Sequence, residues 1–198
     1  MATPPGDRIV NRRYLHIVAA AVTLLGLSAG FAPAPRLLWN ASHSAPVGLY
    51  RIDPGAAPVV GDWVAIAPPT DLADYMARRN YLPRGVPLLK RVAALPGARV
   101  CRSGVFVTVD GRAVARALAR DRAGRPLPAW LGCRIVQPRE IFLINAARDS
   151  LDGRYFGPLP TSGLLGTAHP ILTRDAPGAP LRWRPSGRDL AFPRSEME

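Results

Sequence analysis

Lysine is almost absent from this 198-residue chain, in which Lys90 is the single lysine among 26 basic residues. The other basic residues are arginines, and an arginine stays protonated at any pH at which proteins are stable, so none can act as a general base. A lysine can do so once burial lowers its pKa. Because Lys90 lies in the apolar, strand-like segment Pro87–Val92, we expect its amine to be desolvated.

Cysteine and histidine are also scarce, with two and three residues respectively. The sequence has no Cys-x-x-Cys pair and no cluster of Cys and His, which argues against a structural zinc site. We expect neither a metal nor a cofactor. Cys101 and Cys133 each lie beside a strand-like run. In an exported domain such a pair predicts a disulfide, and the alternative is two unrelated buried thiols.

A block of basic residues is missing too, although the formal net charge is +12. A charge of this size suits a nucleic-acid binder or a protein pressed against anionic lipid. The arginines are spread along the chain, however, and aromatic residues are not interleaved with them. We therefore interpret most of them as solvated surface charge and expect no nucleic-acid partner.

Formal charge is absent from Tyr14 to Ala34 when histidine is neutral, a stretch of 21 residues. This length is enough to cross a bilayer as one helix, so we predict a membrane anchor at 14–34. Three arginines precede it, at positions 8, 12 and 13. The positive-inside rule then places residues 1–13 in the cytoplasm and the remainder outside. The alternative is a signal peptide cleaved after the small residues Ala32–Ala34.

Short strands and many turns are expected after the anchor, because the chain has 18 Gly and 22 Pro. Alternation and turn residues predict strands at 47–52, 62–66, 88–95, 105–109, 112–118 and 140–145. Asp110-Gly111 is typical of a tight primed hairpin turn. One short helix is predicted at 71–79, a loop at 119–130, and a Pro/Arg-rich, loosely held tail at 174–198. The fold class is therefore mainly β.

Several segments carry polar residues in long, specific strings, namely Asn40–Tyr50, Gly61–Ile66, Leu89–Gly97, Asp149–Pro158 and Gly166–Ala168. In this order, after one apolar segment, they resemble the boxes of type I signal peptidases. That family consists of membrane-anchored serine proteases with a Ser–Lys dyad. The strings K-R-V-x-x-L-P-G and S-x-D-x-R-Y-F-G carry most of the resemblance, which covers about residues 8–172.

The first segment departs from the general pattern of that family, in which Ser-Met precedes proline by one further residue. Ser44–Tyr50 is instead similar to the TraF branch, the signal peptidases of conjugative transfer systems. The expected helix at 71–79 and the segment Tyr81–Lys90 that follows it also resemble this branch. Enzymes of the branch process the pilin of a type IV secretion pilus, and in some systems they join the new pilin ends into a ring.

The resemblance implies a role for four side chains. Ser44 would be the nucleophile, which needs a neighbour to take its proton, and Lys90 would be that base. Ser150 would hydrogen-bond the neutral amine and orient it. Ser42, two residues before the nucleophile, would join the Ser44 backbone N–H in an oxyanion hole.

Asp152 and Arg154 are expected to form an ion pair that supports the dyad, a structural role as much as a chemical one. His43, next to Ser44, invites a comparison with a Ser-His-Asp triad. Adjacent residues of an extended segment point to opposite faces, so His43 is poorly placed to deprotonate Ser44. The G-x-S-x-G motif of another class of serine hydrolases is absent.

These expectations combine into a signal-peptidase-like antiparallel β fold with short helices and one N-terminal transmembrane helix. The peptidase domain, residues 35–173, would lie in the periplasm at a bacterial inner membrane and act on an exported precursor, with the pilin first among candidates. Two alternatives stay open: a general secretory signal peptidase, and a non-catalytic pilus-assembly protein on the same scaffold. The sequence does not decide between hydrolysis and cyclisation of the precursor.

Overall fold

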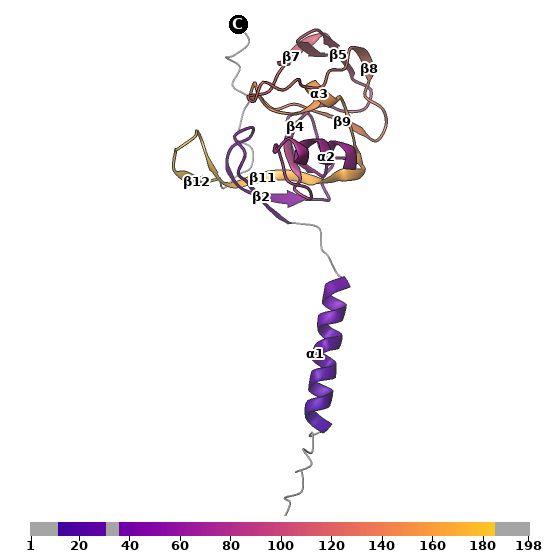
Figure 1. The fold of residues 1–198 in the computed structure, drawn as a ribbon, viewed down its shortest axis with the longest axis vertical. Coiled ribbons are helices and arrows are strands. Elements are labelled where there is room, and N and C mark those ends of the chain that lie inside the picture. The colour runs from indigo at the N-terminus through magenta and orange to yellow at the C-terminus, as the bar shows by residue number, and fades with distance from the viewer. Residues whose placement is uncertain (1–11, 31–35, 185–198) are drawn as a thin grey trace, which may run out of the picture. The chain divides into compact units, whose positions relative to one another are not determined.

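The computed structural model describes residues 12–30 and 36–184, which belong to two separate compact units, 1–34 and 35–198 (Figure 1). In the first unit, helix α1 spans Arg12–Gly30 and overlaps the predicted anchor. No helix among the described residues combines the length and the mean hydropathy needed to cross a membrane. The rest of the predicted anchor, the expected cleavage site at Ala32–Ala34 and residues 1–11 lie outside the described part.

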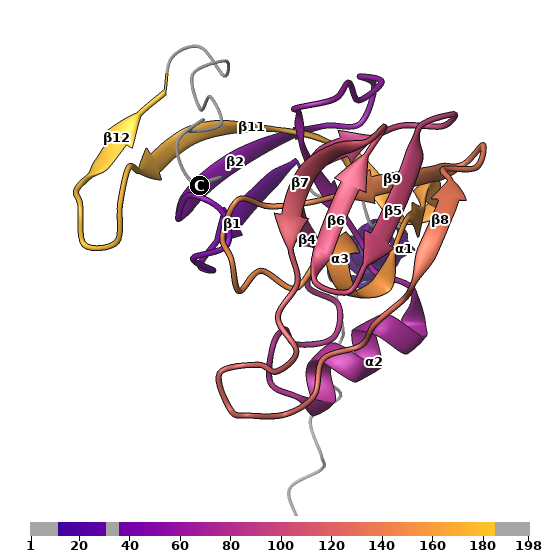
Figure 2. The same ribbon diagram turned by 90° about the horizontal axis from the view of Figure 1, so that it is seen from above.

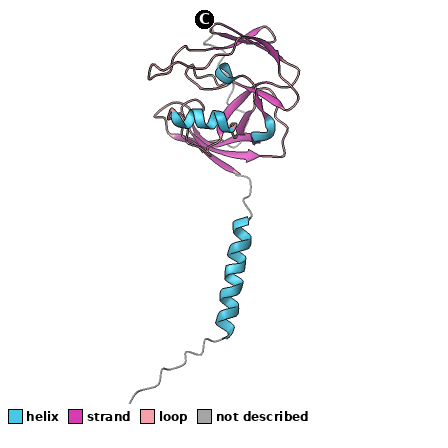
Figure 3. Ribbon diagram, turned by 45° about the vertical axis from the view of Figure 1, so that its right-hand side comes forward, coloured by secondary structure: helices cyan, strands magenta, loops and turns pink. Residues whose placement is uncertain are grey.

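The second unit is built mainly from antiparallel strands, with few and short helices (Figure 3), which confirms the predicted fold class. Its larger sheet has the strand order β1-β2-β11-β3-β4-β9-β10, and β12 pairs with β11. The strands are β1 Leu37–Asn40, β2 Gly48–Asp53, β3 Trp63–Ile66, β4 Leu88–Ala94, β9 Glu140–Leu143, β10 Leu159–Pro160, β11 Leu164–Arg174 and β12 Leu181–Trp183.

A smaller sheet of order β7-β6-β5-β8 is seen with its strands side by side in Figure 2. Its strands are β5 Arg99–Ser103, β6 Phe106–Val109, β7 Arg112–Arg116 and β8 Gly132–Ile135. Asp110 and Gly111 both have positive φ, 48° and 81°, as the predicted primed turn requires. Cys101 and Cys133 lie opposite each other on β5 and β8 and form the predicted disulfide.

Three buried clusters hold the second unit together. Helix α2, Thr70–Arg78, covers one cluster through Met76, Leu72 and Tyr75. A second cluster includes Tyr50 and Ala45, and Ala45 belongs to the loop that carries Ser44. The third joins the two sheets and includes Val100 and Phe142. Short helices α3, Gly153–Phe156, and η1, Thr161–Gly163, connect the last strands. Lys90 and Ser44 thus lie on elements that are anchored by buried apolar side chains.

The predicted strands at 47–52, 62–66, 88–95, 105–109, 112–118 and 140–145 and the helix at 71–79 are present with small shifts at their ends. The expectation of a loosely held tail from residue 174 is wrong for residues 174–184. There the chain turns back and pairs β12 with β11, and the Arg184 N–H donates to the Ile171 carbonyl. Residues 185–198 of the predicted tail lie outside the described residues.

Candidate active site

The loop between β1 and β2 carries Ser42 and Ser44, and the carboxamide of Asn40 organises it. Asn40 Nδ2 donates to the carbonyl oxygens of Ser42, Ala45 and Pro46 at 3.0, 3.1 and 3.1 Å. Its Oδ1 accepts from the Ser42 N–H at 3.1 Å and from the Ser42 hydroxyl at 2.9 Å. The loop is therefore wrapped around one buried side chain, which limits the positions that both serines can take.

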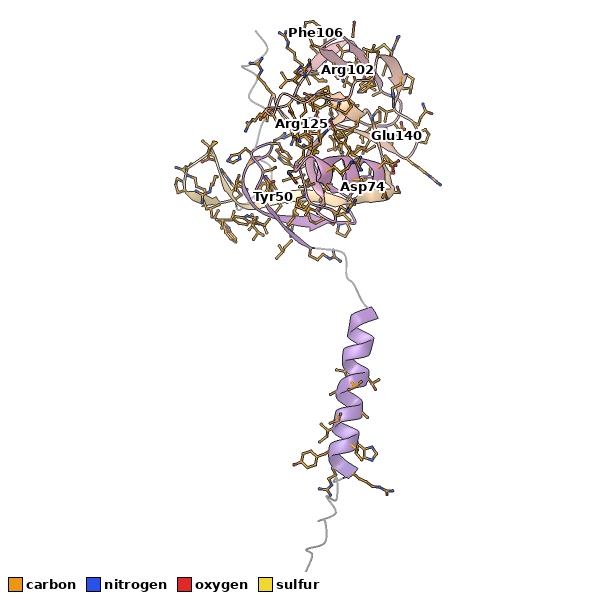
Figure 4. All side chains as sticks on the ribbon, in the orientation of Figure 1. Tyr50, Asp74, Arg102, Phe106, Arg125 and Glu140 are labelled. Carbon is orange, nitrogen blue, oxygen red and sulfur yellow. A yellow bond between two sulfur atoms is a disulfide. The ribbon has the colours of Figure 1, made fainter. Side chains whose placement is uncertain are left out.

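Tyr50 holds the far end of this loop. Its hydroxyl donates to the Pro46 carbonyl at 2.8 Å, and burial raises its pKa well above the usual range. The residue, which is labelled in Figure 4, is fully buried. Nearby, Gly48 has a φ of +151°, and a Cβ added there would lie 2.0 Å from the Leu172 carbonyl oxygen. Glycine is needed here because β2 and β11 approach closely beside the serine loop.

The two serines of the loop contact each other. Ser42 Oγ and Ser44 Oγ are 3.1 Å apart, and either hydroxyl can be the donor. Ser44 is half-buried, whereas Ser42 is exposed. The two hydroxyls therefore lie close together in the loop.

Lys90 lies in the middle of β4, opposite Val64 of β3, and its residue is only 4% exposed. Its ammonium loses hydration there, so burial lowers the pKa of Lys90 to about 8, and the carboxylate of Asp152 partly opposes this shift. Lys90 Nζ donates to Ser150 Oγ at 2.9 Å. The predicted contact between Lys90 and Ser150 is thus present.

Asn145 fixes the backbone on both sides of Lys90. Its Oδ1 accepts from the Arg91 N–H at 3.0 Å, and its Nδ2 donates to the Leu89 carbonyl at 3.2 Å. Its own N–H donates to Asp152 Oδ2 at 3.0 Å. The fully buried Asn145 therefore connects the strand of Lys90 with the segment that carries Ser150 and Asp152.

Asp152 and Arg154 form the expected ion pair, with Arg154 Nε 2.8 Å from Asp152 Oδ1 and both side chains buried. Arg154 also donates to the carbonyls of Asn145 and Arg148, at 2.6 and 3.1 Å. These bonds span the turn that contains Ser150. The pair supports the position of Ser150, and through it that of the lysine amine.

The structure brings the predicted residues together as two hydrogen-bonded groups, Ser42 with Ser44 and Lys90 with Ser150. In the part of the chain that the structure describes, no hydrogen bond joins Ser44 to Lys90. The roles of nucleophile and base therefore stay predictions. His43 likewise makes no hydrogen bond to Ser44 in residues 36–184.

A pocket of about 340 Å³ opens beside Ser44. It is lined by the serine loop at 43–47, by Trp63 and Arg91, by Ala146 and Ala147, and by residues 174–177. Most of these side chains are apolar and several are small, so the pocket offers a mainly apolar surface next to Ser44. Residues 12–30 and 36–184 contain no cluster of His, Cys, Asp and Glu that could hold a metal.

Sequence reasoning missed Asn40 and Asn145 as organising residues. Asn40 had a local signal, because an asparagine side chain often accepts a hydrogen bond from the backbone N–H two residues later and so forms an Asx turn. Asn145 follows an apolar strand as a polar residue in a fully buried position, but its partners are 54 and 56 positions away. A hydrogen bond over such a separation leaves no local pattern.

Residues 9–173 match the family described as signal peptidase, peptidase S26. The chain is 40% identical over 173 residues to the conjugal transfer protein TraF of Agrobacterium tumefaciens, covering 82% of this chain and 97% of that protein. It is 44% identical over 144 residues to a probable conjugal transfer protein TraF of Sinorhizobium fredii, covering 68% and 76%. It is 31% identical over 180 residues to a plasmid transfer protein TraF of Escherichia coli, covering 84% and 99%.

A signal peptidase I of Enterococcus faecalis is similar in structure over 57% of this chain and 97% of that chain, with a TM-score of 0.34 and 18% identity. The family assignment depends on the sequence matches, which extend over most of the chain. The chain therefore belongs to the signal peptidase family S26, in its TraF-type conjugative-transfer branch.

Proposed function

We propose that this serine peptidase cleaves an exported precursor with Ser44 as the nucleophile and Lys90 as the general base. The observation that carries the proposal is the state of Lys90, which is almost completely buried and has a pKa lowered to about 8. At that pKa about one amine in ten is neutral at pH 7 and can accept a proton. General bases work best when their pKa lies near the working pH.

Ser150 has a defined part in this mechanism. A neutral amine has two N–H bonds and one lone pair, and Lys90 uses an N–H to bond Ser150 Oγ at 2.9 Å. The lone pair then stays available for the proton of Ser44. The hydroxyl of Ser44 is hydrogen-bonded to that of Ser42. When the precursor binds, the Ser44 hydroxyl must give up this hydrogen bond and donate one to the Lys90 amine instead. Catalytic hydrogen bonds often form fully only in the complex with substrate.

Ser42 and the backbone N–H of Ser44 would bind the oxyanion of the tetrahedral intermediate. One donor of this kind contributes about 3–4 kcal/mol to transition-state stabilisation in a serine hydrolase. The hydroxyl of Ser42 bonds Asn40 Oδ1 at 2.9 Å, so it must turn towards the substrate as the negative charge develops. Asn40 keeps the backbone of the loop in place while the hydroxyl turns.

The substrate in this proposal is the pilin of a conjugative type IV secretion system. The relatives at 31–44% identity are named for conjugal or plasmid transfer, which supports a dedicated precursor over general secretory precursors. The segment 14–34 would anchor the enzyme in the inner membrane, with residues 35–184 in the periplasm, where an exported precursor emerges. Ser44 first forms an acyl-enzyme and releases one part of the precursor. Water then gives a linear product, whereas the pilin's own amine gives a ring.

Co-expression of the precursor with the full chain tests the proposal. Wild type should convert the precursor to a shorter product, and Ser44→Ala and Lys90→Ala should leave it uncut. Ser103→Ala, at an exposed serine of β5, is the matched control and should cleave normally. Cleavage by Ser44→Ala would overturn the proposal, and intact pilus formation without cleavage would indicate an assembly protein. Mass spectrometry separates a linear product from a ring, which weighs one water less.

A further inference from the structure

The end of β11 and strand β12 form a hairpin that contacts the serine loop. The Arg174 N–H donates to the Val47 carbonyl at 2.9 Å, and Thr173 is paired with Gly48. Figure 2 shows the chain turning back after β11 and returning as β12. Since Val47 belongs to the same loop as Ser44, the hairpin is attached directly to the nucleophile loop.

The turn of this hairpin lies at the pocket. Residues 174–177 line it together with Ser44 and the rest of the serine loop. Asp175 pairs with Arg184 and, at 3.5 Å, with Arg182, so ion pairs to β12 and to the residue after it tie down the start of the turn. Ala176 and Pro177 add a small apolar surface with little conformational freedom. The turn is therefore an ordered wall of the pocket.

This wall begins where the family match ends. The match to the signal peptidase family covers residues 9–173, whereas the turn and β12 follow it. The residues that perform the proposed chemistry all precede residue 174. The hairpin thus adds a surface next to the nucleophile that the shared part of the family does not supply, and such a surface is suited to the choice of substrate.

The charge of the pocket points to one class of substrate side chain. Arg91 and Arg174 both line it, and the Arg91 guanidinium lies 4.7 Å from the centre of the Trp63 ring. The one acidic lining residue, Asp175, already has two arginine partners. Arginine side chains therefore outnumber carboxylates around a pocket whose other lining residues are mostly apolar, which favours an anionic group and disfavours a cationic one.

We propose that the turn at 174–177 is a specificity element that selects precursors with small apolar residues and an acidic side chain next to the scissile bond. The proposal rests on the proposed function, because it concerns the pocket beside Ser44. Peptides that differ at single positions on either side of the scissile bond, with Glu, Ala or Lys, test it. Wild type should cleave the best Glu peptide about five- to tenfold faster, as kcat/KM, than its Lys counterpart, as expected for partly exposed ion pairs.

Two variants change the wall in different ways, one by removing the turn and one by reversing a charge. Replacing residues 175–180 with Asn-Gly closes a tight hairpin between Arg174 and Leu181, which are paired, and keeps both strands. It should accept larger side chains but keep the preference for Glu, because Arg91 and Arg174 remain while Asp175 is lost. Arg174→Glu should abolish or reverse the preference. Arg112→Glu, on exposed β7, makes the same charge change away from the pocket and should leave the preference unchanged.

The outcomes separate this proposal from the proposed function. If Ser44→Ala is inactive but Arg174→Glu keeps the preference for Glu and the Asn-Gly variant still excludes larger side chains, the specificity proposal is wrong while the peptidase assignment stands. Equal cleavage of Glu and Lys peptides by wild type would also overturn the specificity proposal and leave the peptidase assignment standing. If Ser44→Ala cleaves as well as wild type, the peptidase assignment itself fails. The supporting result is loss of the Glu preference in Arg174→Glu and acceptance of larger side chains by the Asn-Gly variant, with a normal preference in Arg112→Glu.

Discussion

The Lys90 amine donates a hydrogen bond of 2.9 Å to the hydroxyl of Ser150, a residue 60 positions away in the chain. The two residues are 4% and 2% exposed, so this bond is shielded from water. It orients the amine through an N–H and leaves the nitrogen lone pair unused when the lysine is neutral. In our account, this bond positions a buried base for its reaction with Ser44.

Exchanging the lysine for arginine should remove activity as completely as exchanging it for alanine. The guanidinium keeps a positive charge but cannot accept a proton. We expect Lys90→Arg and Lys90→Ala to lower kcat/KM by a factor of at least about 100, the usual contribution of a general base. Circular dichroism verifies that both variants fold. Substantial peptidase activity in folded Lys90→Arg would refute the assignment of the base.

Replacing the lysine with a neutral residue of similar size should stabilise the fold while it abolishes activity. The pKa of Lys90 is lowered from 10.5 to about 8 by burial, so the unfolded chain binds more protons between these values and wild-type stability rises with pH across this window. Below pH 8 the buried charge costs about 3 kcal/mol.

Lys90→Met removes this cost. Its free energy of unfolding should exceed that of wild type below pH 8, and the difference should shrink as the pH approaches 10.5. Urea unfolding at several pH values measures it. A difference that stays constant between pH 6 and 10 would argue against a lysine with a lowered pKa.

Asn40 should affect the rate more than substrate binding, because it shapes the loop of both serines without lining the pocket. Asn40→Asp keeps an acceptor for Ser42 but loses the donor to three carbonyl groups, and a buried carboxylate is added. We expect a loss of about 1–3 kcal/mol in stability and a fall in kcat with a smaller change in KM. Unchanged kcat in a folded variant would exclude this positioning role.

The disulfide should matter for stability and not for chemistry. Cys101 and Cys133 are 32 positions apart and join strands of the smaller sheet, whereas Ser44 and Lys90 belong to the larger sheet and its loops. In the chain-entropy model a loop of this size contributes about 3–4 kcal/mol. The double Ala variant should melt at lower temperature but keep wild-type kcat/KM at 25 °C. A loss of activity while the protein is folded would contradict this separation.

The sequence was sufficient to predict the mainly β class, most strands before residue 145, the disulfide and the ion pair of Asp152 with Arg154. These features have local signals, such as alternation, turn residues and long strings. The longest strand, β11, was not predicted because Pro170 interrupts it. The pairing of β11 with β2 shifts at this point, between Pro170 and Leu172, and this irregularity accommodates the missing N–H.

The parts of the site that escaped prediction depend on pairing between distant segments. Asn145 acts through backbone groups of β4, and the hairpin of β11 and β12 gains its place through Val47 and Gly48. The Pro- and Arg-rich sequence after residue 173 shows no sustained alternation of apolar and polar residues, so it did not predict this hairpin. Its order comes from strand pairing and from the two arginines at Asp175.

The central claim concerns the protonation of one amine, and the composition of the chain allows a direct measurement. Because Lys90 is the only lysine, selective 15N labelling of lysine gives a single side-chain amine signal by NMR, without assignment. Its chemical shift, followed against pH in the full chain, should titrate with a midpoint near the lowered pKa of about 8. A midpoint near the ordinary value of 10.5 would show a hydrated, permanently charged lysine and would contradict the account.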